Sequence, residues 1–289
     1  MRTELNRSIL ALTGLLLVAR QAQAQEVVLS AEASNSFRPA VSLGGAPGVD
    51  VGANAVQAAV SMRISLGPRT FFMPGIAYRG QLLDYTGSSP PPDSASSLHT
   101  LEVPLRLFHI LDEHWALAGA FAPGLSGNFA GLDRHFRFSG AALATYAFRR
   151  DFIVGFGAGV DYGAGRWLPL PVLTLDWQIV DGLYLKMLGP IAKLYYRFGD
   201  RVEAGAFTQF DASRWAVVGA SETHTIDSFA VDVGGLLDVR IGGTTWLNVL
   251  AGWSPFRRYE IDGGPRAGRY DAQPGVLLRA GVEVRFPGS

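Results

Sequence analysis

The chain has 289 residues, 25 Lys+Arg against 25 Asp+Glu for a net charge of zero, and no cysteine. This length fits one large domain. The balanced charge excludes nucleic-acid binding, which needs clustered basic residues, and the lack of cysteine excludes disulfides, thiolate metal ligands and cysteine nucleophiles. Hydrophobic residues reach 48% and charged residues only 17%, yet glycine numbers 35. Helices disfavour so much glycine, whereas a barrel with an apolar face toward lipid accommodates all of these values.

The first 24 residues have the pattern of an export signal. Arg2 and Arg7 give a positive start, and residues 8–19 form an apolar run. The run is roughly 12 residues long, against the ~20 that a membrane-spanning helix needs. Small residues at Ala22 and Ala24 then suit a signal peptidase. We expect residues 1–24 to be a signal peptide and residues 25–289 to form one exported barrel, with an uncleaved anchor as the alternative.

From about residue 27 onward the dominant period is two, which is typical of β-strands. In residues 54–66, Val56, Val60 and Ile64 share one face while Arg63 lies on the other. Three further runs show the same alternation, at residues 100–108, 172–179 and 276–286. Many runs exceed the ~9–11 residues that a tilted strand needs to cross the hydrocarbon layer. The runs therefore predict transmembrane strands.

Turn signals of two kinds separate the runs. The short ones are Gly67-Pro68, Asp112-Glu113, Arg150-Asp151, Asp181-Gly182, Gly199-Asp200 and Gly242-Gly243, and the long polar ones are residues 84–97, 123–133, 219–225 and 258–273. Such alternation is typical of an up-and-down barrel, which normally has an even number of strands. The runs at 27–37 and 183–198 are ambiguous. We predict an all-β, antiparallel, up-and-down transmembrane β-barrel of about 12 strands, with 10 to 14 open.

Aromatic residues gather near the ends of the runs, as in the girdles of outer-membrane barrels. They are Phe71, Phe72, Trp115, Tyr146, Phe148, Trp167, Trp177, Tyr195, Tyr196, Trp246, Trp253 and Phe286. Ordinary β-propensity is the alternative explanation. Phe286 also ends the last run close to the C-terminus, where barrel assembly machinery recognises outer-membrane barrels. We therefore expect a Gram-negative outer-membrane location, with membrane lipid and the assembly machinery as partners, and the oligomeric state stays open.

Several segments of the second half resemble a family of uncharacterised bacterial outer-membrane β-barrels, known as a domain of unknown function. The segments are residues 171–177, Leu188-Gly189-Pro190, Leu194-Tyr195-Tyr196, and the pair at residues 231–240 and 246–253. The resemblance implies a barrel fold and an outer-membrane address. It transfers no catalytic residues.

Candidate chemistry is sparse. The closest serine and histidine pairs are His135 with Ser139 and His224 with Ser221, and no lipase-like motif surrounds them. His109 and His114 flank a turn, whereas zinc needs three or four convergent ligands. The glycines of residues 155–159 lack the helix and acidic residue of a dinucleotide site. We expect no catalytic, cofactor or metal residues.

The informative polar residues are those on the face expected to line the lumen. They are Arg63, Glu102, Arg106, Arg137, Asp176, Lys186, Lys193, Arg197, Arg201, Glu203, Asp232, Asp238, Arg240, Arg279, Glu283 and Arg285. In a wet lumen they would line a pore, whereas in a narrow one they must pair, because an unpaired buried charge costs several kcal/mol. Mixed signs favour a paired network over a pore of one charge. The expected function is a structural or small-solute pore role. A barrel lipid hydrolase and a secreted soluble β-sandwich are the alternatives.

Overall fold

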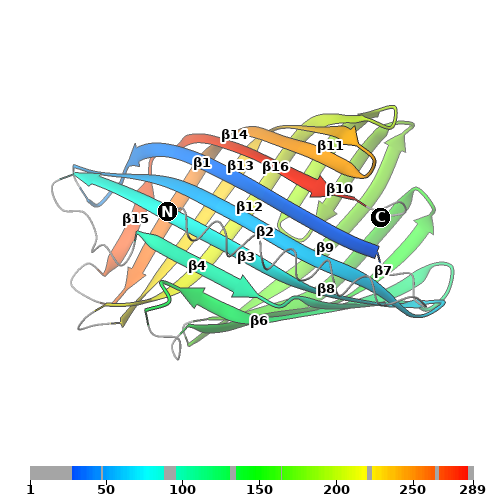
Figure 1. The fold of residues 1–289 in the computed structure, drawn as a ribbon, viewed down its shortest axis with the longest axis horizontal. Coiled ribbons are helices and arrows are strands. Elements are labelled where there is room, and N and C mark those ends of the chain that lie inside the picture. Colours follow the sequence, from blue (N-terminus) through cyan, green and yellow to red (C-terminus); the bar gives the residue numbers. More distant parts are fainter. Residues whose placement is uncertain are drawn as a thin grey trace.

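The structure is a computed structural model that describes residues 28–46, 48–87, 96–130, 135–163, 165–219, 223–263 and 267–285. In it the chain forms one closed, strongly tilted antiparallel barrel (Figure 1). The expected signal peptide, Ser221 and Phe286 lie outside the described residues. Among the residues described, no helix is long and apolar enough to cross a membrane.

The strand segments follow one another around the barrel in chain order. They are β1 Val28–Ser42, β2 Val49–Gly67, β3 Thr70–Gly87, β4 Ser97–Glu102, β5 Leu105–Ile110, β6 Trp115–Gly127, β7 Phe136–Arg149, β8 Phe152–Gly163, β9 Arg166–Val180, β10 Leu183–Leu188, β11 Ile191–Phe198, β12 Val202–Val218, β13 Thr223–Gly242, β14 Thr245–Asp262, β15 Gly268–Ala272 and β16 Gly275–Val284. Strand β1 pairs with both β2 and β16, so the sheet closes on itself.

The barrel has 14 strands, because two pairs of segments each form one interrupted strand. Segments β4 and β5 lie end to end between β3 and β6, and the break falls at Val103 and Pro104. Segments β15 and β16 both pair with β14. The expected fold class is confirmed, and its approximate strand number becomes 14. The ambiguous run at 183–198 contributes two strands, since Gly189 turns the chain with a positive φ of 54°.

The two ends of the barrel differ. We call the end with tight connections, where β1 begins and β16 ends, the turn end, and the other the loop end; they lie at the right and left of Figure 1. Positive φ angles at Gly182, Gly199 and Gly243 allow the tight turns. At the loop end the strands run further than expected, since β14 and β15 occupy most of residues 258–273.

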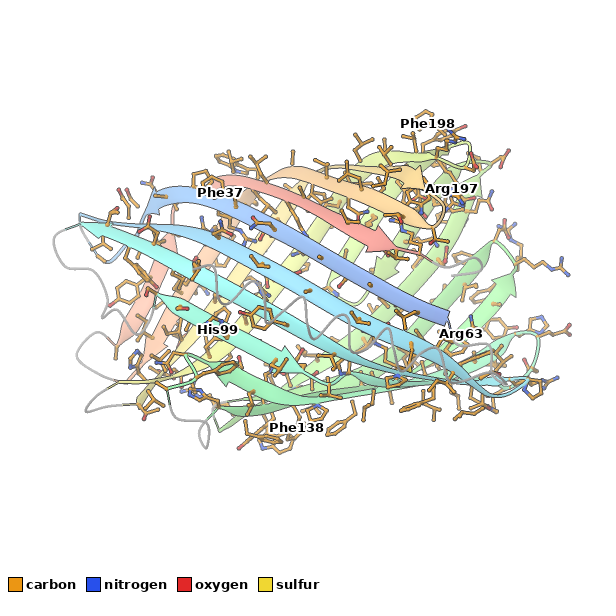
Figure 2. The ribbon with its side chains drawn as sticks, in the orientation of Figure 1. Phe37, Arg63, His99, Phe138, Arg197 and Phe198 are labelled. Carbon is orange, nitrogen blue, oxygen red and sulfur yellow. The ribbon has the colours of Figure 1, made fainter. Side chains whose placement is uncertain are left out.

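The outer surface carries an apolar band between two belts of aromatic rings. Toward the turn end, Trp115 packs against Tyr146 with ring centroids 4.8 Å apart. Toward the loop end, Tyr162 packs against Trp167 at 4.8 Å and against Phe138 at 5.2 Å, and Phe138 projects outward in Figure 2. An apolar band flanked by aromatic belts is the surface of a membrane-spanning barrel.

One hairpin is too short to complete the wall. The pairing of β10 with β9 ends at Leu188 and Thr174, and that of β11 with β12 ends at Ile191 and Gln209. Strand β9 nevertheless extends to Arg166 and β12 to Val218 toward the loop end. The loop-end parts of β9 and β12 therefore have no strand between them.

On the loop-end side of the β10–β11 hairpin, β12 pairs instead with β6, a strand that lies beyond β7, β8 and β9 in the order of the sheet. Ala216 pairs with Gly127 in parallel orientation, and the Ser126 hydroxyl donates to the Arg214 carbonyl oxygen at 2.7 Å. Segments β1–β4, β6 and β12–β15 thereby form a narrower closed barrel in the loop-end half. Strands β7, β8 and β9 remain beside it as a flap that ends at the free edge of β9.

The close approach of β6 to β12 depends on Gly127. A Cβ at this position would overlap the His135 ring and the Ala216 carbonyl oxygen. We therefore expect Gly127→Val to prevent the junction and to lower barrel stability sharply, seen as loss of the heat-modifiable folded band on gels. Gly119→Val is the matched control, since a Cβ there meets nothing within 4 Å. Equal stability of the two variants would contradict the role of the junction.

Candidate functional site

The loop-end half of the lumen is filled by an apolar core. Its buried members come from the narrower barrel and are Leu43, Val49, Val51, Ala53, Leu83, Leu98, Trp215, Val217, Ile226, Tyr259, Ile261 and Ala272. Trp215 is the largest fully buried side chain, at 1% exposure. Interiors of this kind are close-packed. No solute can follow the barrel axis through this core without rearrangement.

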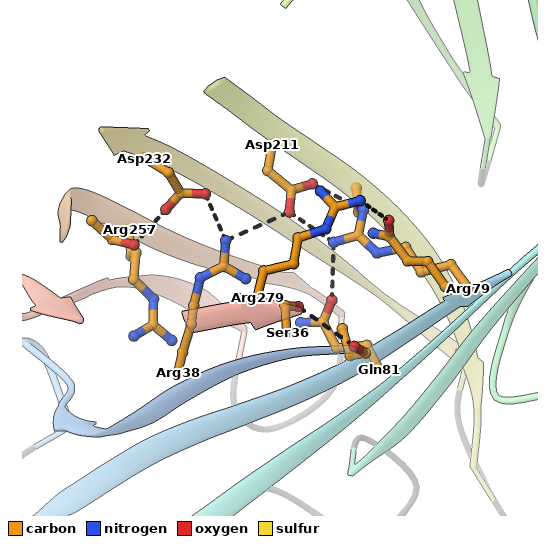
Figure 3. Close-up of polar contacts among 12 residues, drawn as sticks. Ser36, Arg38, Arg79, Gln81, Asp211, Asp232, Arg257 and Arg279 are labelled. Carbon is orange, nitrogen blue, oxygen red and sulfur yellow. Dashed lines mark hydrogen bonds and ion pairs between the residues drawn. The ribbon is translucent and has the colours of Figure 1, made fainter. Parts of the chain in front are cut away.

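A buried ion-pair layer lies on the turn-end side of the core, and Figure 3 shows its polar contacts. Arg38 reaches across the lumen to Asp232 at 2.7 Å, and Arg79 forms a bidentate pair with Asp211 at 2.7 and 2.9 Å. The Ser254 hydroxyl also donates to Asp232, which is 0% exposed. These contacts tie β1 and β3 to β12, β13 and β14. The charges are partnered, as burial requires.

A second ion-pair cluster lies near the turn end of the same wall. Arg285 donates to Glu203 at 3.1 Å and to Asp238 at 2.7 Å, and its guanidinium lies 4.5 Å from the Trp246 ring centroid. Arg197 also pairs with Glu203, at 2.7 Å. Between the two charged layers lies a small apolar cluster of Tyr195, Phe207, Leu236 and Leu277. Apolar and ion-paired layers thus alternate along the β11–β16 wall.

Two cavities lie in the middle of the lumen. The larger, about 370 Å³, is lined by groups that include Lys193, Gln209 and Arg279. The smaller, about 250 Å³, includes Arg79, Glu102 and Arg137. Both are lined by Glu32 and Gln57, so they adjoin. Their walls carry both signs of charge.

A third cavity, which we call the side groove, lies between the flap and the narrower barrel. It measures about 160 Å³ and is lined by Asp161 and Leu168 of the flap and by Arg214, Asp227 and Phe229 of β12 and β13, among others. Ala212 and Ser213 line both the side groove and the smaller mid-lumen cavity.

Arg137 stands between the side groove and the mid-lumen cavity. It pairs with Asp161 of the groove at 2.9 Å and with Glu102 of the cavity at 3.3 Å. The three cavities therefore form a series of neighbours, and the Arg137 ion pairs separate the side groove from the mid-lumen cavities. The series leaves the axis before it reaches the apolar core.

The predicted lumen residues fall into distinct places. Several form ion pairs with one another, namely Glu102 with Arg137, Asp176 with Lys186, Arg197 with Glu203, and Arg285 with Glu203, Asp238 and Glu283. Asp232 belongs to the buried layer, and Lys193 and Arg279 line the larger cavity. Arg63 stacks on Phe71, Arg106 is exposed on β5, and Arg201 and Arg240 lie at the turn end.

Sequence reasoning missed the residues that close the lumen. Arg38, Arg79 and Asp211 of the buried layer are absent from the predicted set, as is Arg257, a 2% exposed residue of β14 that donates to the Tyr259 hydroxyl at 3.0 Å. Their position in the alternation was the available signal. Which acid each arginine meets depends on pairing across the lumen, since Arg38 and Asp232 are 194 residues apart.

His135 and Ser139 do not assemble into a site, and the second candidate pair includes Ser221, which lies outside the described residues. His135 is 1% exposed with its ring against Phe129, and Ser139 lies four residues further along an extended segment, roughly 13 Å at ~3.3 Å per residue. His109 contacts Thr70, and His114 stacks on Tyr146. Among the described residues no group of three metal-ligating side chains occurs.

The closed antiparallel sheet, the apolar exterior and the aromatic belts define a transmembrane β-barrel of the outer-membrane kind. A family model described only as a domain of unknown function, DUF6268, matches residues 91–281. The chain belongs to this family, which confirms the expected resemblance. No curated protein is similar enough in sequence to count as a relative.

Several solved structures of bacterial outer-membrane channels and porins are similar to this chain. The COG4313 outer membrane channel from Pseudomonas putida F1 has 10% identity and a TM-score of 0.48, with 92% of this chain and 98% of that chain covered. The Pseudomonas putida toluene transporter TodX has 10% identity and a TM-score of 0.40, with 89% of each chain covered. The NanC porin has 9% identity and a TM-score of 0.42, with 89% and 100% covered.

Proposed function

We propose that the protein is a non-enzymatic passage for small molecules in the outer membrane, and that its route leaves the barrel axis. The observation that carries the proposal is the series of three adjoining cavities, combined with the apolar core that fills the loop-end lumen. The loop end faces the exterior and the turn end the periplasm, as in other up-and-down outer-membrane barrels. Export by a cleaved signal peptide belongs to the same proposal.

The route begins in the mid-lumen cavities, passes the Arg137 partition and continues into the side groove. Each cavity on this route is small. The passage therefore suits small molecules that displace or exchange the ion-pair contacts one at a time. A wide pore for hydrated ions would need an open axis. In a planar bilayer, we therefore expect the refolded chain to insert without steady ionic current steps.

A non-enzymatic role is supported by the separation of His135 from Ser139 along the chain, and by the lack, among the described residues, of a group of three metal-ligating side chains. The hydrolase alternative would require lipid release by the purified protein that Ser139→Ala or His135→Ala abolishes. The alternating ion-paired and apolar layers stiffen the barrel wall, which favours a passage lined by this wall over a hydrolase.

The sharpest test places a large side chain in the route. Ala212 is exposed and lines both the side groove and the mid-lumen cavity, so Ala212→Trp should fill the connection without disturbing the core. In porin-deficient cells that express the protein, we expect enhanced uptake of some members of a panel of small molecules. Ala212→Trp should return their uptake to the level of cells without the protein.

Ala142→Trp is the matched control, because Ala142 is exposed on β7 and lines none of the three cavities. It should leave uptake unchanged. Steady ionic steps that persist in both variants would instead indicate an open axial pore. Unchanged uptake in every strain would remove the transport role.

A further inference from the structure

The opening above the β10–β11 hairpin has a defined lower border. The Gly189 amide donates to the Leu173 carbonyl oxygen at 3.0 Å, and the Phe210 amide donates to the Pro190 carbonyl oxygen at 2.9 Å. The turn is thus bonded to the strand on each side, and Pro190 has no N–H to satisfy. A turn at membrane depth needs such pairing, because unsatisfied backbone groups are costly in hydrocarbon.

Two prolines lie on the β9 border of the opening. The Leu173 carbonyl points toward the hairpin, and alternation along β9 gives Pro171 and Pro169 the same direction toward the opening. Both are prolines and so present no N–H where a strand partner is missing. Proline on an edge strand avoids unpaired donors. In lipid each such donor would cost several kcal/mol.

At the β12 border, backbone carbonyl groups accept hydrogen bonds from the end of β6 and the residue that follows it, not from a strand within the opening. The Asn128 amide group donates to the Val218 carbonyl oxygen at 3.0 Å, and the backbone N–H of Asn128 donates to Ala216 at 3.3 Å. Along with Ser126 on Arg214, these bonds occupy the edge of β12 that lost β11. The loop-end part of the β12 edge is therefore paired with β6 and the residues that follow it.

The upper border is an ion pair between Arg166, at the start of β9, and Asp262, at the end of β14. This pair bridges the flap to the narrower barrel at the loop end. Trp167 belongs to the loop-end aromatic belt, and Trp177 packs on Phe152 in the turn-end belt. The opening, at the level of residues 167–172, therefore lies in the outward half of the hydrocarbon layer.

The opening is lined by apolar side chains of β9, and polar side chains lie deeper, in the side groove. Leu168 and Leu170 share the β9 face of Asp176, yet they are apolar and 42% and 44% exposed. Behind them, Arg214 donates to Asp227 at 2.6 and 2.9 Å in the side groove. A ligand here would have its apolar part against β9 and a small polar group near these charges.

We propose that this opening is a lateral window, through which an amphiphile dissolved in the outer leaflet passes its apolar chain or ring into the side groove. The occupant is a membrane amphiphile because Leu168, which lines the groove, is itself 42% exposed, and because Pro169 and Pro171 present no N–H at this border. The groove, about 160 Å³, is small beside the ~300–1,000 Å³ of drug-sized pockets, so it holds one chain segment or ring. This inference deepens the proposed function and supplies its substrate class.

The test uses the absence of native cysteine. Leu168→Cys is labelled with bimane, and the protein is refolded into phosphatidylcholine vesicles with brominated acyl chains. Quenching by the brominated lipid is compared with quenching by aqueous iodide. Leu173→Cys, on the outer face of β9, is the lipid control, and Gln57→Cys, in the mid-lumen cavity, is the aqueous control.

We expect Leu168→Cys to be quenched by brominated lipid about as strongly as Leu173→Cys and several times more strongly than Gln57→Cys. Quenching by iodide alone, or by neither agent, would overturn the window. Ala212→Cys, deeper in the groove, repeats the comparison if Leu168→Cys folds poorly. If brominated lipid quenches Leu168→Cys but Ala212→Trp blocks no uptake, the window is retained and the passage is rejected. Blocked uptake with iodide quenching would retain the passage and reject the window.

Discussion

Asp232→Asn is expected to lower the free energy of unfolding by about 3–5 kcal/mol, because it leaves Arg38 buried without its close acidic partner. Asp211 is the next acid near Arg38, at 3.8 Å, and it is already engaged by Arg79. The asparagine preserves the volume of the side chain, so the loss reports charge rather than packing. Reversible urea unfolding in detergent micelles, followed by tryptophan fluorescence, measures the difference.

Asp176→Asn is the matched control for this substitution. Its partner Lys186 lies at 3.0 Å, but the two side chains are 49% and 44% exposed, and such pairs contribute about 0–1 kcal/mol. The double variant Arg38→Met/Asp232→Leu should lose less than Asp232→Asn, since no unpaired charge remains. If Asp232→Asn were as stable as Asp176→Asn, the buried ion-pair layer would be hydrated in solution.

Trp215→Ala should cost about 3–5 kcal/mol, because it empties the centre of the apolar core. The same unfolding measurement applies. Trp253→Ala is the control, since Trp253 is 47% exposed on the outer surface. We expect the control to lose less, because lipid or detergent fills the vacated surface. Equal losses would indicate that the core is loosely packed.

The strand pattern and the belts could be predicted from alternation alone. Val56 and Leu173 are exposed on the outer face, as their positions in the runs require, and Trp115, Tyr146 and Trp167 lie in the two belts. A side-chain period of two is local, so a single strand reveals it without its neighbours. The exposure of apolar residues then follows from lipid as the surrounding solvent.

The upper parts of β12–β14 could not be predicted in this way. Arg214, Asp227 and Glu260 lie on faces that the alternation would assign to lipid, and residues 258–273 consequently looked like a polar loop. In the structure these faces turn toward the flap and line the side groove. A charged outer face is stable there because β12 leaves the wall and pairs with β6.

The sequence by itself determined the strand character of most of the chain, the two-faced strands, the membrane-facing surface and the class of barrel. These depend on local alternation and on the solvent that each face meets. Only the tertiary structure decided that the axis is filled, that Arg38 meets Asp232, and that the wall is open between β9 and β12. Those features depend on strand register and on pairs far apart in the chain, and a period-two pattern carries no information about either.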